Sequence, residues 1–256
     1  MRNQLAEGKA EWLPDHPLVD KTHYALGNYP DGHISGRIAP KYLGRAKNLR
    51  RAWVRICTHL PETTVAGASY DILEFSTAHG AMLEIWQALG HTVRGTDFEA
   101  VAGTQKNYRP INARLEASLG APHQNPVAKD RPGWAYQPII ESICVPVDLF
   151  DAGVTPYAYA DKSVDFICCY QALEAYAAPD DWGRIIAEFC RIARRGVVIG
   201  FNPPGRKQER DAHWSNTRAA WEKLRLHDAH GFRNVLFEME ETGRGLHPTA
   251  CKLVAV

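Results

Sequence analysis

The segment "YDILEFSTAHGAMLEIWQALGHTVRGTDFEA" occupies residues 70–100 and contains the most regular pattern in the chain. Its opening run, YDILEF, is apolar and predicts a short buried strand. GAMLEIWQALG predicts a helix that closes at Gly90, because glycine commonly follows the last helical turn. HTVRGTD then predicts a second strand. A strand, a helix and another strand in this order favour parallel pairing of the two strands.

Strands and helices continue to alternate downstream. The apolar runs SVDFICCYQAL and VVIGFNPPG predict two buried strands, the second of which ends at prolines. Residues 180–196 between them predict an amphipathic helix, with Asp180 or Asp181 as its cap and Gly196 as its stop. A further helix is predicted within residues 99–119.

Two segments depart from this alternation. In IIESICVPVDLF (139–150), Pro146 lacks a backbone donor, which predicts a broken or edge-like strand. After a helix at 211–229, NVLFEMEE and ACKLVAV predict the last two strands. They are separated only by TGRGLHPT, which is too short for a crossover helix, so they should pair antiparallel. The predicted fold class is α/β, with a mostly parallel sheet covered on both faces and a reversed C-terminal strand hairpin.

Residues 1–66 precede this pattern and predict an N-terminal extension with a basic helical cap. PKYLGRAKNLRRAWVRICTH (40–59) has apolar residues at helical spacing, and Pro61 should end the helix. No acidic residue occurs from Gly32 to Pro61, whereas basic residues are frequent: Arg37, Lys41, Arg45, Lys47, Arg50, Arg51 and Arg55. We interpret them by default as a solvated face. The alternative is a surface that attracts an anionic substrate.

Composition excludes several classes of protein. The chain has 256 residues and a net charge of +1, which does not favour a nucleic-acid binder. No apolar run reaches the roughly 20 residues that span a bilayer. The N-terminus lacks the apolar core of a signal peptide. The six cysteines have no CxxC or zinc-ligand spacing. We therefore expect a cytoplasmic protein with reduced, mostly buried thiols and no metal site.

The turn at residues 75–80 and Asp97 form the candidate cofactor site. In a doubly wound sheet, ligands bind beyond the carboxyl ends of the strands, where this turn and the end of the second strand lie. A carboxylate at that place can accept both hydroxyl hydrogens of a ribose. The spacing of Asp97 from Gly80 does not by itself distinguish one nucleotide-like cofactor from another.

Leu73 and Glu74, followed by Ser76, Ala78 and Gly80, resemble the first motif of class I S-adenosylmethionine-dependent methyltransferases, particularly the type 11 group. That motif commonly reads as an apolar strand, LE, an apolar residue and GxGxG. Here serine and alanine take two of the glycine positions. If either position requires a positive φ, the side chain costs about 1–2 kcal/mol there.

The resemblance extends from about residue 67 to residue 256. Asp97 takes the place of the ribose-binding acid of this family. Asp151 and Ala152 match the pair that flanks adenine, and residues 163–165 match the family's SFD block. The resemblance implies a Rossmann-like methyltransferase fold, with a doubly wound sheet of seven strands. It also implies S-adenosylmethionine as cofactor. The histidine that commonly follows LE in the later block is Ala175 here, so no role is carried over to that position.

The residues that the resemblance and their positions assign to the cofactor are Glu74, Phe75, Ser76, Ala78, Gly80, Asp97, Phe98, Asp151, Ala152 and Tyr170. Tyr170 is also the candidate catalytic residue, because a phenol at the end of the central strand could position or deprotonate an acceptor. A packing role for Tyr170 is an equal alternative. Glu74 has a structural alternative as well, in which its carboxylate accepts hydrogen bonds from loop amides.

The function indicated by these features is methyl transfer from S-adenosylmethionine to a small-molecule acceptor. Anionic acceptors that carry a sugar, phosphate or carboxylate are one candidate class. Two alternatives stay open. The altered glycine loop and Ala175 would also suit a non-catalytic binding or scaffolding protein of the same fold. A nicotinamide-dependent oxidoreductase is disfavoured, because the chain has no GxGxxG run.

Overall fold

The structure is a computed structural model that describes residues 23–27, 38, 40–98, 134–202, 214–242 and 245–256. The helix predicted within 99–119 lies outside these residues. The chain divides into two compact units, and the described parts of each are treated separately. Unit 1 comprises residues up to Tyr108 together with Gln124–Phe150, and unit 2 comprises Arg109–His123 and Asp151–Val256.

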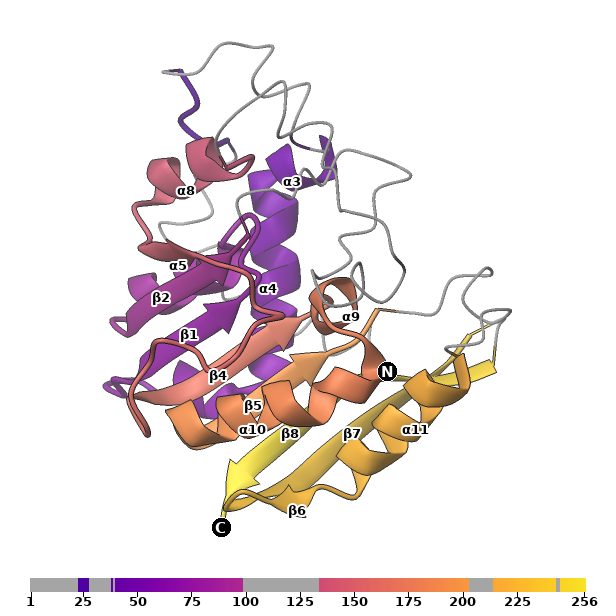
Figure 1. Cartoon of the computed structure of the whole chain (residues 1–256). Helices are drawn as coiled ribbons and strands as arrows, with labels where there is room; N and C mark the ends of the chain where they lie inside the picture. The colour runs from indigo at the N-terminus through magenta and orange to yellow at the C-terminus, as the bar shows by residue number, and fades with distance from the viewer. Residues whose placement is uncertain (1–22, 28–37, 39, 99–133, 203–213, 243–244) are drawn as a thin grey trace. The chain divides into compact units, whose positions relative to one another are not determined.

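Unit 1 contains three parallel strands in the order β3-β2-β1 (Figure 1). The strands are β1 (Asp71–Phe75), β2 (Thr92–Asp97) and β3 (Val147–Leu149). Helix α5 (Ala81–Ala88) joins β1 to β2, as the sequence predicts, and Gly90 follows it with φ 90°. The apolar side chains of β1 and α5 are buried and form the core of this unit.

The helix predicted over residues 40–59 is present in unit 1, but it is interrupted at Gly44. Residues Pro40–Leu43 form α3 and Arg45–His59 form α4, which packs against α5. Gly44 has φ −79° and ψ 81°, a conformation outside the helical region. A short 3₁₀ helix, η1 (Pro61–Thr64), follows α4, so the predicted stop at Pro61 is confirmed.

Unit 2 contains five strands in the order β4-β5-β8-β7-β6. Strands β4 (Val164–Tyr170) and β5 (Ala193–Gly200) are parallel, and β5, β8 (Gly245–Ala255) and β7 (Phe232–Thr242) pair antiparallel. The reversed C-terminal hairpin is therefore confirmed. The two-residue strand β6 (Asp228–Ala229) brings the described strands to eight rather than the predicted seven.

Helices cover the strands of unit 2. Helix α10 (Trp182–Ile192) packs on β5, and α11 (Trp214–Arg225) contacts β7 and β8 (Figure 1). Two short elements, α9 (Leu173–Tyr176) and η2 (Pro179–Asp181), follow β4. Together with the parallel strands of unit 1, this arrangement confirms the α/β class.

The prediction for residues 139–150 was wrong in its first half. Residues Gln137–Ile143 form the helix α8, and only Val147–Leu149 form a strand, at the end of the strand order of unit 1. Pro138 occupies the first turn of α8, where a missing N–H costs nothing, and Cys144 ends the helix in the left-handed conformation. A short apolar run does not distinguish a buried strand from a buried helix.

One predicted end of α10 is confirmed and the other was wrong. Asp181 is the N-cap residue, although its side chain makes no capping hydrogen bond. The helix ends before Ala193, where β5 begins, so Gly196 lies inside a strand. Gly196 is needed there for space, because a Cβ atom would lie 3.0 Å from the ring of Phe166 on the neighbouring strand.

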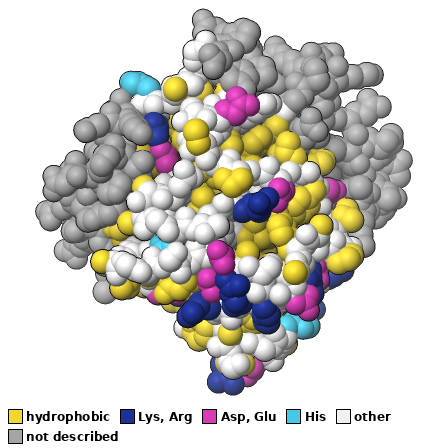
Figure 2. All heavy atoms as spheres, turned by 90° about the vertical axis from the view of Figure 1, so that its left-hand side faces the viewer, with side chains coloured by type: hydrophobic (Ala, Val, Ile, Leu, Met, Phe, Trp, Pro, Cys, Tyr) yellow, Lys and Arg dark blue, Asp and Glu magenta, His cyan; other side chains and the backbone are white. Residues whose placement is uncertain are grey.

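All six cysteines are free, and five of them are buried, with Cys144 exposed. Among the described residues, no helix could cross a membrane and no group of side chains could hold a metal ion. On the face shown in Figure 2, Lys and Arg side chains lie beside Asp and Glu, with hydrophobic side chains exposed between them. This mixture agrees with the net charge near zero.

Candidate functional site

The turn after β1 adopts three left-handed backbone conformations in alternation. Ser76, Ala78 and Gly80 have φ of 58°, 49° and 65°. Ser76 and Ala78, which stand at two of the three glycine positions of the methyltransferase motif, thus take a positive φ although each carries a side chain. Each non-glycine residue costs about 1–2 kcal/mol in this region. The turn keeps the glycine-type backbone in spite of the substitutions.

Surrounding contacts hold the turn in this conformation. Thr77 donates its N–H to the carbonyl of Thr96 (2.9 Å) and its hydroxyl to the carbonyl of Glu74 (3.1 Å). At Gly80, a Cβ atom would lie 2.8 Å from Ile140 in α8, so the glycine is required for packing as well as for φ. The energy lost at the left-handed residues is offset by these tertiary contacts.

We predict that Ser76→Gly and Ala78→Gly each raise the free energy of unfolding by about 1 kcal/mol, because glycine has no steric penalty at positive φ. The midpoint of thermal unfolding should rise by about 2–4 °C for each variant. The control is Ala178→Gly, at a residue with φ −67° and ψ 149°. This change should destabilise slightly, since it only adds unfolded-state entropy. Equal effects at all three positions would contradict the assignment of strain to the turn.

Asp97 ends β2 and is tied directly to the turn. Its Oδ2 accepts the N–H of Ala78 (2.9 Å), and its Oδ1 accepts the N–H of Phe98 (2.7 Å). Burial raises the pKa of Asp97 to about 6, against the opposing effect of the N–H groups of Phe98, Ala78 and Trp134. The carboxyl is therefore mostly ionised at neutral pH. Its oxygens retain lone pairs for further donors, since a carboxylate has about four acceptor sites.

Glu74 lies one residue before the end of β1 and is 7% exposed. Within the described residues, its Oε2 atom has no hydrogen-bond partner. Burial raises the pKa of Glu74 to about 8, with the positive charge of Arg55 lowering it and Asp97 raising it. The structural alternative for Glu74 was that loop amides donate hydrogen bonds to its carboxylate. Among the described residues, no amide donates to Oε2. A buried acceptor without a partner is costly, so a donor from a ligand would be favourable there.

The pKa of Glu74 predicts that stability falls as the pH rises. The unfolded chain ionises near pH 4.5, whereas the folded chain keeps the proton until about pH 8. Stability from this group is thus fully present below pH 4.5 and is lost between pH 4.5 and 8. The shift from 4.5 to about 8 corresponds to at most about 5 kcal/mol at 1.36 kcal/mol per pKa unit.

Glu74→Gln should remove this dependence, because glutamine remains neutral. Denaturant unfolding at pH 5, 6, 7 and 8 should show the variant gaining stability relative to the wild type at each step. The expected relative gain is a few kcal/mol between pH 5 and pH 8. Parallel pH profiles for the two proteins would show that Glu74 ionises normally.

Aromatic side chains from distant segments form a series of ring contacts that reaches the turn at His79, and no sequence motif indicates them as a group. Tyr42 of α3 lies 5.6 Å from the ring of His79 and 5.5 Å from that of Tyr136. Tyr136 in turn contacts Trp134 edge-on at 6.2 Å. Burial raises the pKa of Tyr136 well above its usual value, and Tyr42 and Asp97 add to this effect, so its phenol stays protonated. The aromatic run WAY (134–136), directly before α8, was the available signal.

Arg45 corrects the interpretation of the basic helix as a solvated face. It is buried and forms an ion pair with Glu84 of α5. Its guanidinium also donates to the carbonyl of His23 (3.2 Å) and lies 5.5 Å from the ring centre of Tyr24. The hydroxyl of Tyr24 accepts from Asn48 (3.1 Å). These contacts fasten the N-terminal segment and α4 to the helix that follows the turn.

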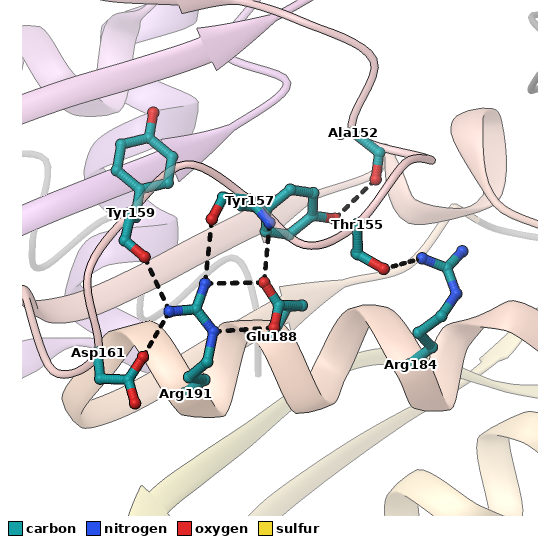
Figure 3. A network of polar contacts seen from close by, with 8 residues as sticks. All are labelled: Ala152, Thr155, Tyr157, Tyr159, Asp161, Arg184, Glu188 and Arg191. Atoms are coloured by element: carbon teal, nitrogen blue, oxygen red, sulfur yellow. Dashed lines mark hydrogen bonds and ion pairs between the residues drawn. The ribbon is translucent and has the colours of Figure 1, made fainter.

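In unit 2, the loop from Asp151 to Lys162 contains the predicted pair Asp151 and Ala152. Arg191 of α10 donates to both oxygens of Glu188, to Asp161 and to the carbonyls of Tyr157 and Tyr159 (Figure 3). Glu188 also accepts the N–H of Tyr157 (2.9 Å), and these donors lower the pKa of its carboxyl.

The same loop is closed on itself near the predicted pair. The hydroxyl of Tyr157 donates to the carbonyl of Ala152 (2.6 Å), and Asp151 Oδ1 accepts the N–H of Gly153 (2.8 Å). Arg184 donates to the carbonyl of Gly153 (3.0 Å). It also donates to the hydroxyl of Thr155 (Figure 3). Charged side chains of α10 thus hold the loop that contains Asp151 and Ala152 in place.

Tyr170 ends β4 and packs against a neighbouring glycine. A Cβ atom on Gly200 would lie 2.2 Å from the Tyr170 ring, so the ring covers that residue. Nearby, Asn202 donates its N–H to Glu174 (2.8 Å) and its side-chain amide to the carbonyl of Gln171 (2.9 Å). Desolvation raises the pKa of Glu174 to about 7. The catalytic role of Tyr170 stays a prediction, next to an evident packing role.

The chain matches no known family model and no curated protein sequence. It is similar to several solved methyltransferase structures. The magnesium protoporphyrin IX methyltransferase of Synechocystis PCC 6803, solved with bound S-adenosylmethionine, is 13% identical, with a TM-score of 0.46. The match covers 90% of this chain and 97% of that chain.

Two further structures are similar at the same level. A methyltransferase from Methanosarcina mazei is 17% identical, covering 77% of this chain and 95% of that one, with a TM-score of 0.45. The 1,6-didemethyltoxoflavin-N1-methyltransferase of Burkholderia thailandensis, with its substrate and S-adenosylhomocysteine, is 16% identical. That match covers 90% of this chain and 87% of the other, with a TM-score of 0.43.

Proposed function

We propose that this protein transfers a methyl group from S-adenosylmethionine to a small-molecule acceptor. The observation that carries the proposal is the hydrogen bond between Ala78 in the turn and the carboxylate of Asp97. It joins the turn and the acid at the ends of adjacent parallel strands, the place where α/β folds bind nucleotides. The ordered motifs from residue 73 to residue 165 support the assignment to methyltransferases.

The residues of unit 1 fit such a ligand. Asp97 offers acceptor sites for a ribose, and Glu74 Oε2 is a buried acceptor that lacks a donor among the described residues. The left-handed turn brings backbone groups of residues 75–80 close to the same acid. Successive left-handed and right-handed residues can orient N–H groups toward an anion such as a carboxylate. Asp151, Ala152 and Tyr170 are the proposed contacts from unit 2.

When bound, S-adenosylmethionine supplies a methyl group already activated on a sulfonium. The protein then has to align the acceptor with that carbon and, for a hydroxyl acceptor, to remove a proton. We assign alignment to the residues around the turn. Tyr170 is the proposed group for positioning or deprotonating the acceptor.

An anionic acceptor is the proposed substrate class. Lys47, Arg50 and Arg51 are exposed on α4, and they remain available to attract an anion after Arg45 is assigned to its ion pair. Exposed cations raise the local concentration of anionic ligands and speed their association, an effect that salt weakens. The proposal therefore expects methyl transfer to slow as ionic strength rises.

The test is thermal unfolding with S-adenosylmethionine, S-adenosylhomocysteine or NAD(H). A ligand at about 100 times its dissociation constant adds about 2.7 kcal/mol. This corresponds to a rise of about 5–10 °C for a chain of this size. A rise with both adenosyl ligands and none with NAD(H) is expected. No rise with an adenosyl ligand would overturn the proposal and favour a non-catalytic protein of the same fold.

A further inference from the structure

Strand β7 of unit 2 is paired along the whole of one side but only briefly on the other. Strand β8 pairs with it from end to end, whereas β6 pairs only with Phe232 and Arg233. The carbonyl of His227 also accepts the N–H of Asn234. Among the described residues, no strand continues beside Val235–Thr242 on this side. A strand edge of this length is a template for pairing with another strand.

The edge of β7 carries exposed apolar side chains. Val235 is 56% exposed and Met239 is 41% exposed, so the fold does not bury them. Val235 is the extra residue of a β-bulge, because the residues on either side of it pair with consecutive residues of β8. Although β7 has a second irregularity of register, it contains neither proline nor lysine, the residues that commonly block a strand edge. The edge is therefore suited to contact with a second strand.

The charges of β7 select one arrangement for pairing with a second copy of the chain. In a two-fold antiparallel pair, positions equally far before and after the central residue lie opposite each other. A centre at Glu238 would place that carboxylate opposite itself, and a centre at Met239 would place Glu238 opposite Glu240. Like charges directly opposite are destabilising. A centre at Phe237 avoids both arrangements.

Pairing centred on Phe237 also matches the exposed apolar side chains. It places Val235 of each copy opposite Met239 of the other, on both sides of the two-fold axis. Arg233, whose side chain is 59% exposed in spite of an ion pair within its own copy, then lies at the same end as Glu241 of the second copy. Opposite charges thus flank the apolar contacts, and this complementarity favours a second copy of the same chain as the partner.

We propose that this protein forms a two-fold symmetric dimer in which β7 pairs antiparallel with β7 of a second copy, centred on Phe237. The strands of unit 2 in the two copies then form one continuous sheet. Few residues pair at this edge, so the dimer should be weak and should depend on protein concentration. The inference needs no adenosyl ligand and is independent of the proposed function.

Sedimentation equilibrium at a series of protein concentrations tests the dimer. The wild type should pass from monomer to dimer as the concentration rises. Val235→Glu should raise the dissociation constant of the dimer at least tenfold, because the two-fold axis introduces the charge twice, each time opposite Met239. The matched control is Val65→Glu, at a residue of unit 1 that is 62% exposed. This variant should dimerise as the wild type does.

A charge pair tests the register. Met239→Lys should also weaken the dimer, because it places a cation opposite Val235 and near Arg233 of the second copy. The double variant Val235→Glu/Met239→Lys should recover most of the lost affinity, since a centre at Phe237 places each new carboxylate opposite a new ammonium group.

Three outcomes would overturn the proposal. The first is a wild type that stays monomeric at every concentration. The second is a dimer that neither single variant weakens, because its interface would then lie elsewhere. The third is a double variant that shows only the summed effects of the two single changes, because the two positions would then not lie opposite each other.

Discussion

Asp97→Ala is expected to raise the dissociation constant for S-adenosylhomocysteine at least tenfold. The variant removes the acceptor of the ribose hydroxyls, and hydrogen bonds to charged groups contribute about 1.5–3 kcal/mol each. It also removes the acceptor of the Ala78 N–H, so the turn loses its link to β2. Binding should therefore weaken for two reasons. The direct contact with the ribose is lost, and the turn is no longer tied to β2.

The measurement is calorimetric titration of both proteins at pH 7.5, where the pKa of about 6 leaves Asp97 mostly ionised in the wild type. The matched control is Asp148→Ala, at an exposed aspartate of β3 paired with Arg94. An exposed ion pair contributes about 0–1 kcal/mol, so this variant should bind normally. An unchanged dissociation constant in Asp97→Ala would refute the ribose assignment.

The largest effect on stability is expected at Arg45. Arg45→Met should lower the free energy of unfolding by about 3–5 kcal/mol, because it leaves the buried charge of Glu84 without a partner. The midpoint of thermal unfolding should fall by about 6–20 °C. The control is Arg225→Met, which breaks the exposed ion pair with Glu222 and should cost at most about 1 kcal/mol.

The double variant Arg45→Met/Glu84→Leu separates the ion pair from the packing of the helices. Replacing both partners by apolar residues removes the unpaired charge, so much of the lost stability should return. A double-mutant cycle then gives the coupling energy between the two residues. Purely additive effects would show that the ion pair does not couple α4 to α5.

Much of the fold was predictable from the sequence because burial leaves a periodic signal. The apolar runs of β1, β4 and β5 and the helical spacing in α4 and α10 each predicted the right element. The short link between β7 and β8 predicted their antiparallel pairing. Residues 139–150 failed because the same apolar run suits a helix or a strand, and contacts with the turn at Gly80 favour the helix.

The candidate site was predictable only in part. The turn and Asp97 are close in the chain and occupy positions set by the strands, so local patterns were sufficient to indicate them. The aromatic neighbours of the turn are not local: Tyr42, whose ring lies next to His79, precedes it by 37 residues, and Tyr136, whose ring lies next to Tyr42, follows His79 by 57 residues. Arg45 looked like one more exposed cation, because only the three-dimensional structure shows Glu84 opposite to it.

The sequence by itself determined the α/β order of elements, the reversed terminal hairpin and the pairing of a turn with an acid. These features follow from hydrophobic periodicity and link length, which act within short segments. Tertiary structure alone decided that Ser76 and Ala78 take left-handed conformations and that Glu74 Oε2 is buried with no hydrogen-bond partner among the described residues. The reason is physical: backbone strain and the burial of a polar atom depend on neighbours from distant segments, whose contacts no local pattern records.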